Sequence, residues 1–178
     1  MEKKSNYVFT FLSILAWIIF VGLCVEAGAL IVNFVFSLFK PEFVQNLYQK
    51  LDLSEMYTIS KWDFFNMYIF ILAISLLKAY LFYIVVRLID KLDLQKPFNS
   101  FVSKQITHIS YFTLSIGLLS SLAQHTSTNL LRQGFKIDRL DQFWADSEAF
   151  ILMSAIIYII ASIIKRGVEI QNENDLTV

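Results

Sequence analysis

Two charged side chains stand inside long apolar stretches of this sequence, Glu26 in the first stretch and Lys78 in the second. A charge surrounded by hydrocarbon costs roughly 3 kcal/mol on insertion scales, so such groups are usually paired or functional. Three roles would fit them: a buried ion pair that fixes the alignment of two helices, ion or proton transfer, or a counter-charge for a ligand. If the membrane-embedded part of the first stretch begins near Trp17, the two charges share a depth. If it begins near Tyr7, they do not, and Lys78 would extend toward water.

Few other residues have types and spacings that suggest catalysis or metal binding. His108 and His125 are too far apart on one predicted helix to chelate a metal together, and Cys24 is the only cysteine. Zinc-protease, phosphate-loop, nucleophile-elbow and cysteine-pair motifs are all missing from the sequence. We therefore expect no metal, no cofactor and no enzymatic activity. An intramembrane enzyme that pairs Glu26 with one of the histidines is the remaining enzymatic alternative.

Composition identifies the solvent of this chain as lipid. Of its 178 residues, 56% are hydrophobic and only 17% are charged, whereas soluble domains have about a quarter charged. The 15 basic and 15 acidic residues give a net charge of zero, which argues against direct nucleic-acid binding. Membrane lipid is the partner that composition indicates.

Four apolar stretches predict the helices that must position the two charges. They cover about residues 7–39, 64–89, 101–131 and 148–164, and each is long enough to span a bilayer. The first would be about 50 Å long, more than a bilayer core of about 30 Å needs, so it must tilt or one end must project. We expect a single all-α domain, an integral membrane four-helix bundle, followed by a cytoplasmic tail at 165–178. Apolar residues at helical spacing also predict short amphipathic helices in the two outer loops, at 41–51 and 136–144.

The distribution of basic residues predicts the orientation. Eight Lys and Arg residues flank the side that carries both termini, and six flank the other side. This excess favours a multi-pass protein of the bacterial inner (cytoplasmic) membrane with both termini cytoplasmic. Trp62 and Trp144 are then expected to lie in the aromatic belt at the outer interface.

Polar and small residues mark the helix faces that we expect to contact protein. In the first stretch, Glu26 aligns with Gly22, Ala29, Asn33 and Ser37. The third stretch is the most polar, and small or hydroxyl-bearing residues follow one of its faces. Such faces most often hold helices together, although they can also line a hydrated cavity. The predicted interior polar positions are Asn33, Ser110, Thr113, Ser120, Gln124 and Thr128.

The C-terminal segment carries a resemblance to a known family. Residues 163–178, Ile-Ile-Lys-Arg-Gly-Val-Glu-Ile-Gln-Asn-Glu-Asn-Asp-Leu-Thr-Val, resemble the ending of the bacterial membrane proteins grouped as domain of unknown function 2975 (DUF2975). The turn Lys96-Pro97-Phe98-Asn99 and the four-span layout are similar to that family as well. The resemblance implies a cytoplasmic-membrane protein without an established activity. It also implies a small helix-turn-helix regulator as a partner, because such a regulator is often encoded beside family members.

The tail has the composition of a docking segment. A basic pair at the membrane face is followed by acidic and apolar residues, and anionic lipid attracts such a pair. The tail is either a short helix packed on the bundle or a binding segment for a cytoplasmic partner. The candidate partner-binding residues are Lys165, Arg166, Glu169, Glu173 and Asp175.

Two function classes follow from these features. We expect first a non-enzymatic sensory or regulatory membrane component. The alternative is a small transporter or channel subunit that uses Glu26 and Lys78, and four spans would require it to form a homo-oligomer to build a pore.

Overall fold

The computed structural model describes residues 2–92, 99–135 and 140–175, and nearly all of them are helical. Four long helices run through the molecule: α1 (Glu2–Phe39), α3 (Lys61–Asp90), α4 (Ser100–Arg132) and α5 (Ser147–Asp175). Each contains a segment long and apolar enough to cross a membrane. The predicted all-α, four-helix architecture is confirmed, and the composition of the helices makes this a multi-pass membrane protein.

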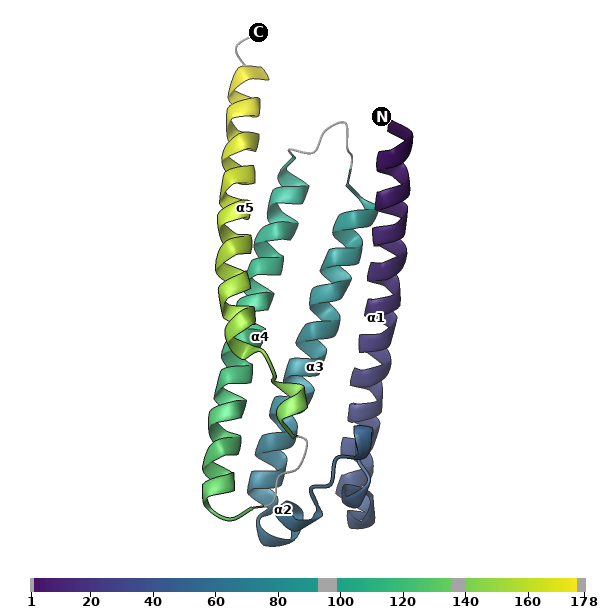
Figure 1. The fold of residues 1–178 in the computed structure, drawn as a ribbon, viewed down its shortest axis with the longest axis vertical. Helices are drawn as coiled ribbons and strands as arrows, with labels where there is room; N and C mark the ends of the chain where they lie inside the picture. The colour runs from purple at the N-terminus through teal and green to yellow at the C-terminus, as the bar shows by residue number, and fades with distance from the viewer. Residues whose placement is uncertain (1, 93–98, 136–139, 176–178) are drawn as a thin grey trace.

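The four long helices form an open row in the order α1, α3, α4, α5 (Figure 1). Each packs mainly on its neighbour in the sequence, and α1 and α5 form the two edges. Only 6% of the most apolar window of α1 is buried inside the chain. The outer faces of the edge helices are therefore available to lipid or to another protein.

The two ends of the row differ in construction. The N- and C-termini lie at one end, which we call the terminal end, and the segments that join α1 to α3 and α4 to α5 lie at the other, the loop end (Figure 1). The largest fully buried side chains come from the loop-end halves of the long helices and from the connecting segments, and include Phe64, Tyr68 and Trp144. The hydrophobic core of the protein thus lies in its loop-end half.

The connection between α1 and α3 forms a compact cap rather than one amphipathic helix. It consists of the 3₁₀ turns η1 (Pro41–Gln45) and η2 (Tyr48–Lys50) and the short helix α2 (Ser54–Ile59). A backbone pairing between Leu47 and Leu51, with positive φ at Gln49 and Lys50, breaks the predicted helix. The apolar positions behind that prediction still point inward, since Val44, Leu47 and Leu51 are buried.

The connection between α4 and α5 also folds back onto the helices. The 3₁₀ turn η3 (Leu140–Phe143) buries Leu140 and Phe143, while the start of the predicted 136–144 helix lies outside the described residues. Trp144 is only 2% exposed, so the prediction that it belongs to the aromatic belt is wrong. Trp62, at 86% exposed, has the exposure expected of a belt residue.

The helix ends show how the sequence sets the limits of the spans. Asn99 caps α4, because its side-chain oxygen accepts a hydrogen bond of 2.9 Å from the Val102 backbone N–H. The predicted helix start requires such a cap. Residues 96–98 of that turn lie outside the described residues. The fourth helix does not end with its apolar stretch at Ile164 but continues to Asp175. Most of the predicted tail is therefore an extension of α5, which projects beyond the other helices (Figure 1).

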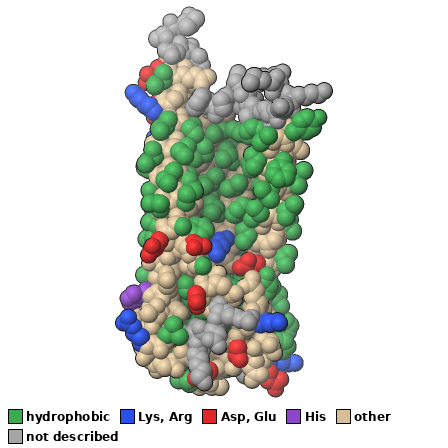
Figure 2. Space-filling model, in the orientation of Figure 1, with side chains coloured by type: hydrophobic (Ala, Val, Ile, Leu, Met, Phe, Trp, Pro, Cys, Tyr) green, Lys and Arg blue, Asp and Glu red, His purple; other side chains and the backbone are tan. Residues whose placement is uncertain are grey.

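The surface shows an apolar band of the kind that a membrane protein presents to lipid. On the face in Figure 2, apolar side chains cover the helices below the terminal end and give way to a row of acidic and basic side chains partway down. Below that row the surface is mixed. The face is thus divided between a part suited to hydrocarbon and a part suited to water or lipid headgroups.

Candidate functional site

Lys78 is directed at the segment that precedes α5. Its ammonium group donates a hydrogen bond of 3.2 Å to the backbone carbonyl of Phe143, and its side chain is partly buried. Two carboxylates, Glu26 from α1 and Asp146 from the loop before α5, act on it electrostatically. Lys78 thus links α3 to η3, the turn that precedes α5, a contact that the sequence did not indicate.

The alignment of α1 and α3 places Glu26 and Lys78 at the same depth. Ser13 Oγ donates a hydrogen bond of 2.9 Å to the Asp90 carboxylate, which fixes the two helices at the terminal end. From that level, 13 residues along α1 lead to Glu26 and 12 residues back along α3 lead to Lys78, or about 18–20 Å in each case. The two groups therefore have the common depth that pairing requires.

The structure shows no direct ion pair between these two side chains. Among the described residues, Arg166 and Glu169 form the ion pair that the structure shows, with 3.0 Å between the guanidinium nitrogen and the carboxylate oxygen, on the surface of α5. Glu26 interacts with Lys78 only through space, and shares it with Asp146. The predicted charge pair is thus part of a group of three charges, Glu26 of α1, Lys78 of α3 and Asp146 just before α5. Its role in ion handling or helix alignment stays a prediction.

The protein-facing side of α1 differs from the predicted polar face. Its buried positions are Ala16, Ala27, Leu30 and Ser37, spaced as in a helix that packs on one neighbour. Glu26 and Asn33 lie at the margin of this contact and are partly buried. Gly22, predicted to face protein, is exposed, and a Cβ added there would have no atom within 4 Å.

The polar face of α4 is buried over part of its predicted length. Ser110, Thr113 and Ser120 are each at most 4% exposed and lie in the interior, as placed by the sequence. Gln124 and Thr128 are exposed, so their interior placement is wrong for the single chain. The buried face continues instead through Ala123, Ser127 and Leu130. From Ser120 onward the buried positions follow alternating steps of three and four residues, whereas the prediction used steps of four.

The contact between α4 and α5 depends on small residues near the middle of α4. A Cβ on Gly117 would lie 2.9 Å from the Ile151 backbone nitrogen and 3.1 Å from the Ser147 carbonyl, so only glycine fits without a shift. Ser147 at the start of α5 donates a hydrogen bond of 3.2 Å to the Gln124 side-chain oxygen. These contacts hold the loop-end part of α5 tightly against α4.

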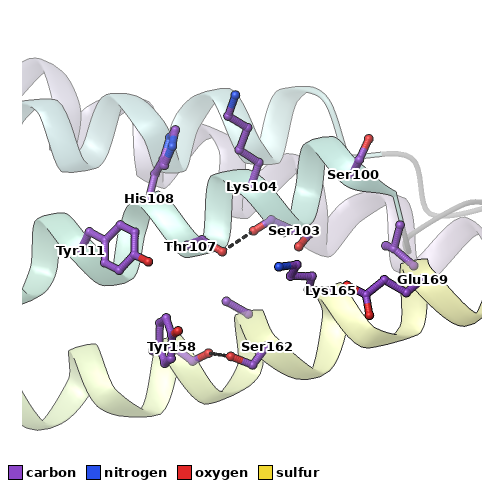
Figure 3. Close-up of a pocket in the computed structure, with 12 residues that line it drawn as sticks. Ser100, Ser103, Lys104, Thr107, His108, Tyr111, Tyr158, Ser162, Lys165 and Glu169 are labelled. Carbon is purple, nitrogen blue, oxygen red and sulfur yellow. Dashed lines mark hydrogen bonds between the residues drawn. The ribbon is translucent and has the colours of Figure 1, made fainter.

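Toward the terminal end, the same two helices leave a polar groove of about 470 Å³ between them. Hydroxyl groups line it on both sides, and Lys104, His108, Lys165 and Glu169 add ionisable groups. Figure 3 shows Lys165 directed from α5 toward α4, whereas Lys104 and His108 project from α4 away from α5. The sequence did not predict this groove.

The candidate partner-binding residues occupy the α5 extension. Lys165, Arg166 and Glu173 are exposed, and Glu169 is partly buried through its place in the groove. Asp175 is the last residue of α5, and its side chain lies outside the described residues. These residues share a continuous helix, but only Lys165 and Glu169 share the groove.

Comparison with known proteins adds no assignment. No family model matches this chain, no curated protein matches it, and no solved structure matches it. The resemblance to the DUF2975 family therefore stays a prediction that depends on the residues quoted for it.

Proposed function

We propose that this four-span protein is a non-enzymatic sensory or regulatory component of the bacterial cytoplasmic membrane, with both termini in the cytoplasm. In this proposal, a change at the loop end, outside the cytoplasm, moves α5, and its cytoplasmic extension presents the change to a partner. A helix-turn-helix regulator is the partner that the resemblance to the DUF2975 family suggests.

The continuity of α5 carries the proposal. The helix runs unbroken over 29 residues, from Ser147, partway along α4, to Asp175 beyond the terminal end of the other helices (Figure 1), or about 43 Å. Its start is connected to both neighbours: Lys78 of α3 binds the carbonyl of Phe143, just before the helix, and Gln124 of α4 binds Ser147. A rigid helix connected in this way would transmit a displacement of the segment between α4 and α5 along its length.

The packing of α4 on α5 favours a relay over transport. Gly117 contacts Ile151 between the terminal-end groove and a second polar pocket beside Gln124 and Asp146. This close approach separates the two polar spaces along the helix pair. No observation on the described residues favours the transporter alternative.

The relay can be tested by a distance measurement on the full chain in lipid nanodiscs. In a Cys24→Ser background, spin labels at positions 91 and 170, both exposed, report the position of the α5 extension relative to α3. Lys78→Met removes the hydrogen bond to Phe143 and should shift or broaden the distance distribution. Lys61→Met, a change of an exposed lysine on the same helix, is the matched control and should leave the distribution unchanged.

A milder variant protects this test from a failure to fold. Ser147→Ala removes only the contact with Gln124 and should shift the same distribution by less. Identical distributions for the wild type, Lys78→Met and Ser147→Ala, in samples that elute as folded protein, would disprove the relay.

Docking is tested separately by copurification of the candidate regulator: undiminished capture by a chain that lacks residues 165–178 would remove the α5 extension as its binding segment.

A further inference from the structure

The groove between α4 and α5 has the chemistry of a phosphate-binding site at one end. Ser100 and Ser103 bring hydroxyl groups to it, and Lys165 extends between the two helices (Figure 3). Thr107 and Ser162 also line the groove, but their hydroxyls donate to backbone carbonyls of their own helices. The groove also lies beside the first turns of α4, where the helix dipole favours an anion. Hydroxyls, an ammonium group and a helix start together form a suitable environment for a phosphate.

The charge balance of the groove supports an anionic occupant. Lys165 contributes a positive charge inside the groove, and Lys104, whose side chain projects away from α5, adds one at the rim. Glu169 is the opposing carboxylate, and Arg166 pairs with it at 3.0 Å. The pairing compensates the negative charge of Glu169, so the groove keeps a positive excess.

The groove changes character along the helices. Tyr111 and Tyr158 face each other with ring centroids 6.1 Å apart, and both also line a neighbouring cavity of about 330 Å³, closer to the loop end, together with Leu114 and Ala155. Paired tyrosines between a polar and an apolar region are typical of the membrane interface. The polar groove and the more apolar cavity thus adjoin at the tyrosine pair, with the polar one nearer the terminal end.

We infer that this groove binds one anionic phospholipid. The headgroup phosphate lies at Lys165 and the surrounding hydroxyls, and an acyl chain passes the Tyr111–Tyr158 pair toward Leu114. A free phosphate would satisfy the polar end alone, whereas the continuation into the apolar band is explained by a lipid tail. Basic pockets between helices on the cytoplasmic side are a known type of site for acidic lipid headgroups. The lipid site does not depend on the proposed relay.

Native mass spectrometry of the full chain, titrated with phosphatidylglycerol or with phosphatidylcholine of the same acyl chains, tests this inference. We expect phosphatidylglycerol to bind more tightly. Lys165→Gln should lower its affinity about fivefold, since a basic residue near an acidic headgroup contributes about that factor. Lys104→Gln should have a smaller effect, because this side chain lies on the rim. Neither change should affect phosphatidylcholine.

Two further variants separate the site from general attraction to the membrane. Lys91→Gln removes an exposed lysine at the end of α3, at the same terminal end but outside the groove, and should leave the affinity unchanged. Ser162→Trp fills the groove from an exposed position without altering charge, and should weaken the binding of both lipids. Because both positions are exposed, the variants are expected to fold, and size-exclusion profiles verify it.

Three outcomes would overturn the lipid site. One is equal affinity for the two lipids. Another is an equal effect of Lys91→Gln and Lys165→Gln, which would show diffuse attraction to the surface. The third is displacement of the bound lipid by millimolar glycerol 3-phosphate, which would identify the groove as a site for a soluble anion.

Discussion

At the loop end, side chains from three of the long helices and from the connecting segments close around Phe64 and Tyr68, whereas at the terminal end α4 and α5 leave a groove between them. Tyr68 even donates its hydroxyl to the Leu30 carbonyl of α1, at 3.1 Å. The loop end is thus packed like the core of a soluble protein, and the terminal end is not. A chain with two such halves can hold one end fixed while the other adapts to a lipid or a partner.

We expect the largest effect on this contrast when a large side chain in the loop-end core is replaced by alanine. Phe64 is fully buried and contacts the rings of Tyr57, Phe65 and Tyr68. Phe64→Ala should lower the free energy of unfolding by about 3–5 kcal/mol, measured by denaturant titration in detergent micelles. Phe101→Ala, the same change at the partly buried start of α4, should cost much less. Equal losses would show that the two ends are equally packed.

A charge reversal examines the boundary between the two halves. Lys78→Glu replaces a donor to the Phe143 carbonyl with a repelling carboxylate, and should cost about 2 kcal/mol, the range for a hydrogen bond to a charged group. Adding Glu26→Lys should restore part of the folded yield, because opposite charges again share this depth. Recovery should be incomplete, since the Phe143 carbonyl still faces a carboxylate. A double variant no better than either single one would disprove the coupling of Glu26 with Lys78.

We expect the smallest effect when a methyl group is added at the close contact between α4 and α5, which tests how tightly α5 packs there. Gly117→Ala places a methyl group against the backbone of α5, and should lower stability by about 1 kcal/mol after the better helix propensity of alanine is counted. Gly22→Ala adds the same group to open space on α1, and should leave stability unchanged or slightly raised. Thermal unfolding of both variants in one detergent makes the comparison, and a stabilised Gly117→Ala would contradict the close approach.

The number and limits of the spans could be predicted from the sequence because each depends on local properties. Hydrophobic length identifies a span, and a residue such as Asn99 caps the helix that directly follows it. The contact face of α1 could not be predicted in the same way. Lipid-facing and protein-facing positions are both apolar there, so the pattern does not separate exposed Val25 from buried Leu30.

The site was less predictable, because its contacts join segments that are far apart in the sequence. The depth shared by Glu26 and Lys78 was one of two predicted alignments, and the contact of Ser13 with Asp90 selects it. The carbonyl that Lys78 binds belongs to a loop whose backbone direction no residue pattern specifies. The burial of Trp144 has the same origin, since a tryptophan near the end of a span suits the membrane interface equally well.

The open row of helices also has a consequence for biogenesis. Each long helix after α1 packs on the one made just before it, so a newly inserted helix finds a docking surface already in the bilayer. Such sequence-local topologies avoid the slow search for distant partners. The chain can therefore assemble in the order of its synthesis, and α5 then docks on an α4 that is already in place.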